Sequence, residues 1–284
     1  MENKTIKKNK HITTKLLISL IILLLLCITF AFYILFKTDT KKEDEIIIDD
    51  NPTIDEQIEV KQIFPYFSKD EFNSYKDIND DYIGQVIFKS GIINEPVVYS
   101  ETYAYYLRRN LKEEYSIQGT IYLDERNTLD DQNLILYGHY TREEFTDYEE
   151  YIPGVRPRFS NLELLLDEDN YIDNKEVYLY LEDEIRTYEI VGVYNCPLIL
   201  DEEGNYSYVE DGYEYYITNY SLDEFNEYKN IIDKAMLYDT KQDYSYDDKF
   251  LTLQTCVEGR KDIREIVLCK QIKVESIEDY ESEN

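Results

Sequence analysis

An uninterrupted apolar run over residues 16–36, LLISLIILLLLCITFAFYILF, is the first clear pattern along the chain and carries no charge. Coiled as a helix, such a run is long enough to cross a bilayer core of roughly 30 Å. Lysines precede it and acidic residues follow it, which predicts a cytoplasmic tail at residues 1–15 and a chain that is otherwise outside. A cleaved signal peptide is the alternative, but the run exceeds a typical signal core and no small-x-small site follows it. The pattern therefore predicts a single-pass protein of the cell membrane.

An acidic stretch separates this run from a folded domain. Residues 37–60 are polar and acidic, and they predict an extracellular linker. Residues 61–275 mix short apolar segments with turn residues, which predicts one folded domain of ordinary size. Residues 276–284, SIEDYESEN, predict an acidic C-terminal tail.

Short segments with alternating apolar and polar residues predict β-strands within the domain. IGQVIF, at residues 83–88, shows this alternation. Strands are expected at residues 83–88, 119–124, 133–139, 212–218, 249–256 and 263–274, and two more within 176–194.

Helical spacing is clearest at residues 221–239. There Ser221 and Glu224 form a capping-box pattern ahead of an apolar stripe at helical spacing. Shorter helices are expected at residues 99–111 and 158–167. Many short strands with a few interspersed helices predict a mainly β fold, a closed or half-closed barrel with added helices.

The charge balance narrows the classes of partner. The chain has 60 acidic and 30 basic residues, a formal net charge of -30, which argues against nucleic acid because phosphate binding needs clustered Lys and Arg. Hydrophobic residues make up 43% of the chain, well above the level of a disordered acidic tract. The 30 tyrosines are interpreted as ordinary core and surface residues of a β-rich fold.

The chain has four cysteines, and their number bears on their state. Cys27 lies within the apolar run, and Cys196, Cys256 and Cys269 follow it. An odd number outside the run leaves at least one thiol free or paired between molecules. Cys196 and Cys269 are interpreted as packing residues. No metal-binding spacing such as C-x-x-C is present, and no metal or cofactor is predicted.

Three residues have the chemistry of an acyl-transfer site. Cys256 ends the strand LTLQTC, His139 follows the strand LILYG, and Arg264 opens the next apolar strand. A thiolate can attack a carbonyl, an imidazole can move the proton, and a guanidinium can stabilise the oxyanion. If the last two strands are antiparallel neighbours, Cys256 and Arg264 lie close together. Each residue alone has an ordinary alternative: a buried packing cysteine, an exposed loop histidine, or half of a surface ion pair.

The arrangement of these motifs resembles the sortase family. Residues 252–256, TLQTC, match the family's Thr-Leu-x-Thr-Cys signature, and LILYGHY and Arg264 have the corresponding places around it. The similarity extends to IGQVIFKSGIINEPVVYSETYAYYLRRN and SIQGTIYLDERN, and covers about residues 60–275. The helix at residues 221–239, ahead of the cysteine strand, is similar to class B sortases in particular.

The resemblance implies an eight-stranded sortase-type β-barrel with added helices, including the long helix before the cysteine strand. It implies a membrane-anchored cysteine transpeptidase with His139, Cys256 and Arg264 as catalytic residues. The residues expected to bind substrate are Leu107, Gln254, Thr255 and Glu258.

The resemblance also implies the partners of the reaction. The substrate is a surface protein with a C-terminal sorting signal, of Asn-Pro-x-Thr-x type, cleaved between Thr and the next residue. The acceptor is an amine of a cell-wall peptide precursor or of a pilin lysine.

Some positions depart from the family pattern and leave alternatives open. Tyr140 follows the histidine where Asn is usual, Gln254 stands where Ser is common, and Gly84 is followed by Gln85 instead of an aromatic residue. These departures affect substrate preference. The alternatives are a non-catalytic surface binding module on the same barrel, or a hydrolytic cysteine protease.

Overall fold

The computed structural model describes residues 67–141 and 158–278 of the 284-residue chain. These residues all belong to one compact unit, which runs from Lys61 to Asn284.

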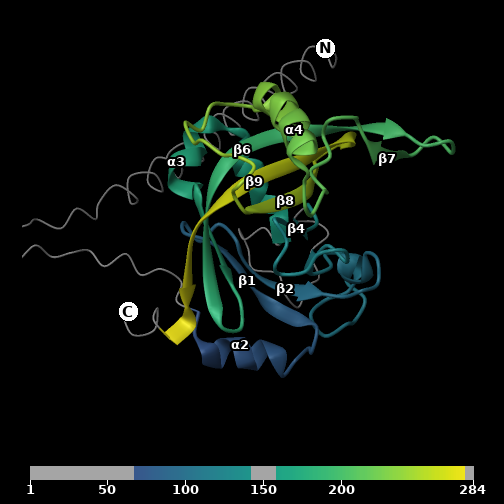
Figure 1. The fold of residues 1–284 in the computed structure, drawn as a ribbon. Coiled ribbons are helices and arrows are strands. Elements are labelled where there is room, and N and C mark those ends of the chain that lie inside the picture. Colours follow the sequence, from purple (N-terminus) through teal and green to yellow (C-terminus); the bar gives the residue numbers. More distant parts are fainter. Residues whose placement is uncertain (1–66, 142–157, 279–284) are drawn as a thin grey trace, which may run out of the picture. The chain divides into compact units, whose positions relative to one another are not determined.

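Eight strands close into a β-barrel (Figure 1). Neighbours pair in the order β5-β1-β2-β3-β4-β8-β9-β6, and β6 pairs again with β5. The strands are β1 (Tyr82–Phe88), β2 (Asn94–Tyr99), β3 (Ile121–Leu123), β4 (Asn133–Tyr137), β5 (Glu176–Tyr180), β6 (Glu184–Leu200), β8 (Phe250–Val257) and β9 (Arg260–Ser276). The predicted eight-stranded sortase-type barrel is therefore confirmed. A further strand, β7 (Tyr206–Val209), pairs with the end of β6 and forms an arm beyond the barrel.

Strand alternation divides the apolar residues of β8 and β9 between two cores. In β8, Leu251 and Leu253 belong to the main core, together with Val267 and Cys269 of β9. Residues at the intervening positions of the same strands, such as Phe250, belong to a second core on the opposite face. The side chains of one strand thus fill the barrel on one face and meet covering elements on the other.

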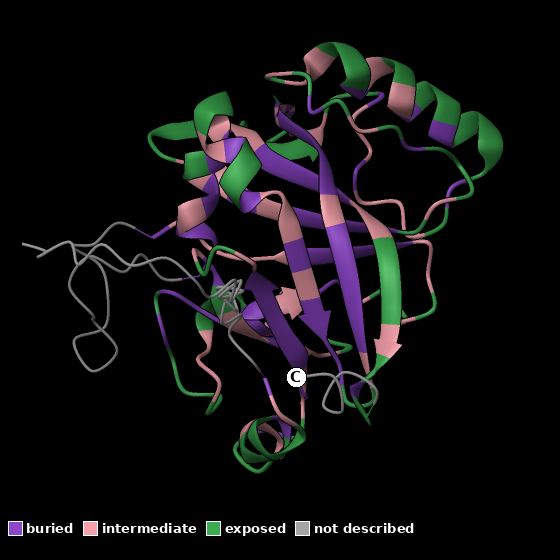
Figure 2. Ribbon diagram, turned by 90° about the vertical axis from the view of Figure 1, so that its left-hand side faces the viewer, coloured by how far each residue is buried: buried purple, intermediate pink, exposed green. Residues whose placement is uncertain are grey.

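Helix α4 (Leu222–Ala235) covers this second core. Its N-terminus has the predicted capping box, in which the Ser221 side chain accepts from the backbone N–H of Glu224. One side of the helix is buried and the other is exposed (Figure 2). The helix ends before the predicted residue 239 because Met236 leaves helical geometry and the Leu237 N–H donates to the Val193 carbonyl of β6, 2.9 Å away.

The remaining helical elements within residues 67–141 and 158–278 are short. They are α2 (Lys69–Lys76), η1 (Tyr105–Arg108), η3 (Arg158–Leu166), η4 (Glu168–Asn170) and α3 (Tyr171–Asn174). The helix predicted at residues 99–111 is reduced to the single turn of η1, because Arg109 and Tyr115 form a β-bridge that turns the chain back. The helix predicted at residues 158–167 exists as the 3-10 helix η3. Neither α2 nor β7 was expected from the sequence.

The strand predicted at residues 212–218 is wrong. The segment forms turns, and two of its carbonyls accept hydrogen bonds from a side chain. The Asn133 amide donates to the carbonyls of Tyr215 and Ile217, each at 2.9 Å. The Tyr215 ring is buried in the second core, which holds the segment against the barrel without strand pairing.

The predicted membrane localisation is corrected by the described structure. Among residues 67–141 and 158–278, no helix is long and apolar enough to cross a membrane. The longest, α4, has 14 residues and carries charges, whereas a membrane-spanning helix needs about 20 apolar residues. The predicted tail, span and linker at residues 1–60 lie outside the described residues.

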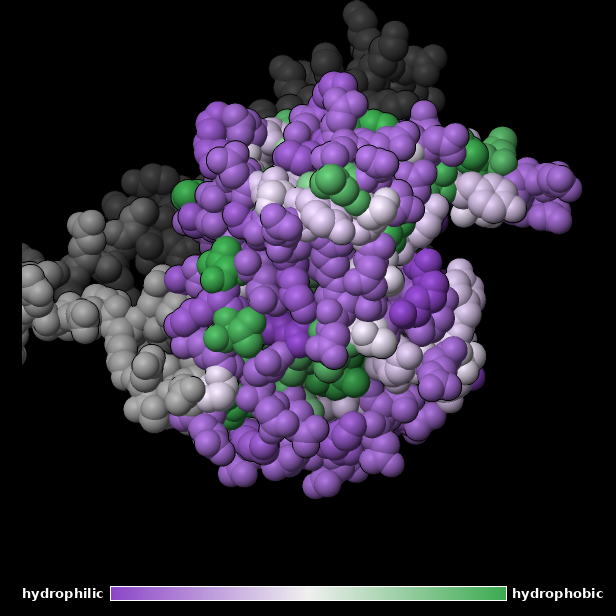
Figure 3. All heavy atoms as spheres, in the orientation of Figure 1, coloured by the Kyte–Doolittle hydropathy of each residue, from purple (hydrophilic) through white to green (hydrophobic). Residues whose placement is uncertain are grey.

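The surface is in keeping with the acidic composition. On the face shown in Figure 3, hydrophilic residues cover most of the area and apolar residues gather in separate small patches.

Candidate active site

Two parallel strands bring the predicted histidine and cysteine to the same end of the barrel. Strand β4 pairs with β8 in parallel, with Tyr137 opposite Gln254. The pairing continues beyond β4, because the Gly138 N–H donates to the Gln254 carbonyl at 3.1 Å. His139 and Cys256 each lie two residues beyond the Tyr137–Gln254 pair, so both follow the same edge of the sheet.

Only a glycine fits before the histidine. A Cβ atom at Gly138 would lie 2.6 Å from the ring of Phe159. Because Gly138 has no side chain, the chain at the end of β4 can pass close to η3. His139 then follows directly after the strand.

The third predicted residue lies beside the cysteine. Strands β8 and β9 are antiparallel, and Cys256 stands opposite Arg264. This confirms the predicted closeness of the two residues. The Arg264 guanidinium donates to the Ile263 carbonyl at 2.9 Å and forms no ion pair with a carboxylate of the described residues. Its charge is therefore not neutralised within the described part of the chain.

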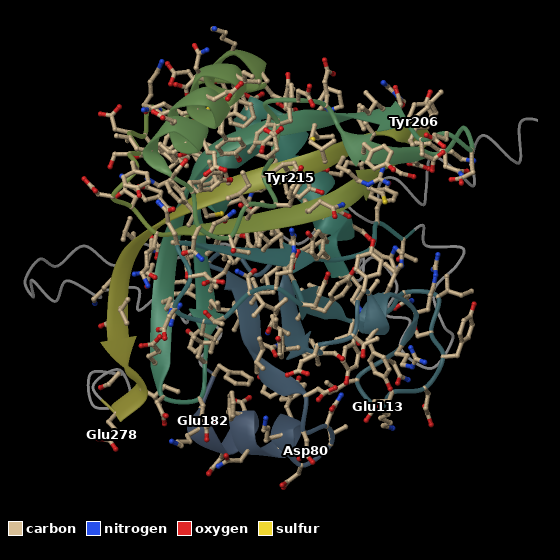
Figure 4. The ribbon with its side chains drawn as sticks, turned by 45° about the vertical axis from the view of Figure 1, so that its right-hand side comes forward. Asp80, Glu113, Glu182, Tyr206, Tyr215 and Glu278 are labelled. Atoms are coloured by element: carbon tan, nitrogen blue, oxygen red, sulfur yellow. The ribbon has the colours of Figure 1, made fainter. Side chains whose placement is uncertain are left out.

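His139, Cys256 and Arg264 line one pocket of about 640 Å³, together with Leu107 and Gln254. Tyrosines dominate the wall: seven line it, and they come from several different elements. They are Tyr103, Tyr122, Tyr137, Tyr206, Tyr208, Tyr215 and Tyr216. Tyr206 comes from β7 and Tyr215 from the segment after it (Figure 4). Aromatic walls with few charges suit an extended peptide chain.

The tyrosines were not expected to form a binding surface. The sequence carries no local signal for it, since they are brought together only when the barrel closes.

Hydrogen bonding fixes the orientation of His139. Its Nε2 lies 2.8 Å from the Leu107 carbonyl, which only accepts, so Nε2 carries the proton and Nδ1 is left for a second partner. Burial lowers the pKa of His139, and the positive charge of Arg108 lowers it further. The neutral imidazole is therefore the main form at neutral pH.

The three described cysteines differ in access. All are free thiols, and only Cys256 among them is partly exposed. Burial raises the pKa of Cys196 to about 12, with Arg264 opposing the shift, and burial raises the pKa of Cys269 as well. The interpretation of Cys196 and Cys269 as packing residues is confirmed by their complete burial.

The predicted substrate-binding residues divide into two groups. Leu107 and Gln254 line the pocket. Thr255 does not, because it alternates with Cys256 along β8 and its side chain is fully buried. Glu258 lies outside the lining, where its carboxylate accepts from the Tyr140 hydroxyl at 3.0 Å.

An ionic network in the pocket was missed at the sequence level. The Arg126 guanidinium donates to the Asp124 carboxylate at 2.8 and 2.6 Å, and the Tyr137 hydroxyl donates to the same group at 2.8 Å. Burial would raise the pKa of Asp124, but these hydrogen bonds outweigh it and lower the pKa. Asp124 ends the segment GTIYLD, and its place at a strand end was the signal that could have identified it.

A second buried carboxyl lies behind the pocket. Glu265 stands between Thr255 of β8 and Asn195 of β6 in the sheet register. One side-chain oxygen of each of these three residues is buried without a hydrogen-bond partner in the described structure. Burial raises the pKa of Glu265 to about 8, and the negative charge of Glu163 adds to the shift.

No three His, Cys, Asp or Glu side chains of the described residues are grouped so as to hold a metal ion.

The chain is similar to known sortase B proteins. Sortase B of Listeria monocytogenes is 26% identical over 196 residues, which is 66% of this chain and 68% of the relative. The X-ray structure of Clostridium perfringens sortase B has 26% identity and a TM-score of 0.56, covering 71% of this chain and 99% of that one. No family model matches the sequence.

A structure solved with a bound substrate has the same fold. The Staphylococcus aureus sortase B–substrate complex has a TM-score of 0.57 at 21% identity, over 72% of this chain and 86% of that one.

Proposed function

We propose that this chain is a class B sortase in sequence and fold, and hence a cysteine transpeptidase. On this premise, it cleaves a C-terminal sorting signal after a threonine and transfers the acyl group to an amine. The observation that carries the proposal is the meeting of Cys256, His139 and Arg264 in one pocket.

The first half of the reaction forms a thioester. The Cys256 thiolate attacks the threonine carbonyl, and the carbon–nitrogen bond to the next residue breaks. Arg264 stabilises the negative charge on the carbonyl oxygen in the transition state. His139, as imidazolium, gives its proton to the leaving amine.

The second half regenerates the enzyme. An acceptor amine attacks the thioester carbonyl, the carbon–sulfur bond breaks, and His139 takes a proton from the amine. The acceptor is an amine of a cell-wall peptide precursor or of a pilin lysine.

The environment of His139 determines how much of this residue is in the imidazolium form. Since the pKa of His139 is lowered by burial and by Arg108, the imidazolium is a minor form at neutral pH. The first half needs His139 in this imidazolium form, so only the minor form of the residue can give its proton to the leaving amine.

The pocket supports a peptide substrate. Its tyrosine walls provide apolar area and hydroxyl groups for an extended backbone, and Gln254 and Arg126 provide side-chain donors along it. These features support an extended peptide segment as the substrate, and we propose a signal of Asn-Pro-x-Thr-x type on the sequence resemblance alone.

The test follows the covalent intermediate. The full chain is incubated with a panel of sorting-signal peptides, with and without an added amine, and intact protein mass and products are recorded. We expect an acyl adduct on Cys256, which the amine converts to an amide product. Cys256→Ala should form no adduct. Cys196→Ala, a change to a buried thiol, is the matched control and should still form it.

Three results would contradict the proposal in different ways. Cleavage by the Cys256→Ala variant would exclude the thioester scheme. Acid product alone, with or without amine, would indicate a hydrolytic protease. A Cys256 thiol inert to both peptides and alkylation would indicate a non-catalytic binding module.

A further inference from the structure

Cys256 also lines a second, smaller groove. It has a volume of about 390 Å³, and its lining comes from the β6–β7 turn with the first residue of β7, from Cys256 of β8 and from the first residues of β9. Cys256, Arg264 and Tyr206 line both this groove and the tyrosine-lined pocket. The thiol is therefore approached by two separate depressions.

The charge of the second groove differs from that of the chain. All its charged lining residues are cations, namely Arg260, Lys261 and Arg264, in a protein with a net charge of -30. Arg260 forms an ion pair with Asp262 at 2.7 Å, which offsets its charge. Lys261 and Arg264 form no ion pair with a carboxylate of the described residues. The groove therefore keeps an excess of positive charge next to the thiol.

We infer that this cationic groove binds the acceptor of the transfer reaction, and that the acceptor is an amine that also carries a carboxylate, as a short peptide with both termini free does. The inference rests on the proposed transpeptidase activity and names the chemical class of its second substrate. A transpeptidase must bring two substrates to one thiol, and the two depressions that share Cys256 provide for both.

The positive charge of the groove favours both the carboxylate of such an acceptor and the neutral form of its amine. A carboxylate gains charge-assisted hydrogen bonds from a lysine or arginine side chain. An amine must be uncharged to attack, and nearby cations favour its neutral form over the ammonium. A simple diamine, with a second positive charge, would be repelled from the same groove.

The neutral amine nitrogen forms a bond to the thioester carbonyl carbon, and the carbon–sulfur bond breaks. Sulfur leaves with the electron pair as the Cys256 thiolate. The proton lost by the nitrogen passes to the neutral imidazole of His139, which restores the thiolate and imidazolium of the starting state.

Binding is measured without the chemistry, so that the inference and the proposed activity can fail separately. The full chain with Cys256→Ala forms no thioester, and it is titrated with glycylglycine and with glycylglycinamide by saturation-transfer NMR. The two probes differ only in the carboxylate. We expect glycylglycine to bind about three- to ten-fold more tightly than its amide, an effect typical of one partly exposed ion pair.

Lys261→Gln, made in the same background, should remove this preference. Lys112→Gln, at an exposed lysine that lines neither depression, is the matched control and should keep it. Equal binding of the two probes, or a Lys261→Gln chain that keeps the preference, would overturn the inference. If glycylglycine binds as expected but no peptide acylates the wild-type chain, the proposed activity fails and the anion-binding groove remains.

Discussion

Successive side chains of β8 and β9 point to opposite faces of the sheet, which separates the reactive side chains from the buried ones. Cys256 and Arg264 face the pocket, whereas their neighbours Thr255 and Glu265 are buried on the opposite face. A shift of one residue in the register would exchange the two sets. The antiparallel register of these two strands therefore decides which groups can reach a substrate.

Glu265→Gln should make the protein more stable, and increasingly so as pH rises. The pKa of Glu265 is raised to about 8 in the folded protein, whereas an unfolded Glu has a pKa of about 4.3. Between these two values the unfolded chain releases the proton and the folded chain keeps it. Each pH unit in this window costs the wild type up to about 1.4 kcal/mol of unfolding free energy, with no further loss above the folded pKa.

Urea unfolding at about pH 5, 6.5 and 8 measures the difference. The advantage of the Glu265→Gln variant should grow across the series. Thr255→Val removes an unpaired buried hydroxyl of the same row but no charge, so its effect should be the same at each pH. A constant advantage for the Glu265→Gln variant would mean that the carboxyl is already ionised in the folded protein.

Among the elements, the two longest strands connect the barrel to part of the candidate active site. Strands β6 and β9 have 17 residues each and pair from Glu184–Ser276 to Pro197–Ile263. Their shared end holds Arg264 and leads into β7, whose Tyr206 lines both depressions at the thiol. The length of these strands thus places β7 in the wall of the tyrosine-lined pocket.

Helix α4 closes the second core, and Phe225→Ala tests how much stability this provides. Phe225 is buried and packs against the rings of Tyr220, Tyr244 and Phe250. Removing a buried aromatic ring leaves a cavity, and we expect a loss of about 3–5 kcal/mol in unfolding free energy by urea titration.

Leu222→Ala is the control on the same helix. Leu222 is 54% exposed, so its truncation should change the unfolding free energy by less than about 0.5 kcal/mol. Similar losses for Phe225→Ala and Leu222→Ala would contradict the view that the buried Phe225 ring is the main source of the stability that α4 provides.

For the whole molecule, net charge opposes compactness. The formal charge of -30 creates self-repulsion in the folded state, and salt screens charges beyond a Debye length of about 10 Å at 0.1 M. We expect the melting temperature at neutral pH to rise by about 2–5 °C between low salt and physiological salt, measured by calorimetry.

The same salt series at pH 4.3 is the control, because the sequence pI is about 4.3 and the net charge vanishes there. Salt should then change the melting temperature little. An equal rise at both pH values would indicate a general effect of salt on apolar burial instead of relief of repulsion.

Patterns local in sequence determined much of this protein. Alternation predicted strands at β1, β4, β8 and β9, and the capping box predicted the start of α4, because side-chain periodicity and capping act over a few residues. The motif around Cys256 identified the sortase fold and brought His139 and Arg264 forward as partners. Each of these patterns can be recognised from a few neighbouring residues, without knowledge of the tertiary structure.

Only the tertiary structure decided which residues share a space. The parallel pairing of β4 with β8 brings together residues more than a hundred positions apart, and the barrel closes where β5 pairs with both β1 and β6. No local pattern reports the long-range contacts among these. The tyrosine walls, the Asp124–Arg126 pair, the buried Glu265 and the cationic groove all depend on that closure. The turns at residues 212–218 show the same dependence, because Asn133, far away in the sequence, supplies the hydrogen bonds that replace strand pairing.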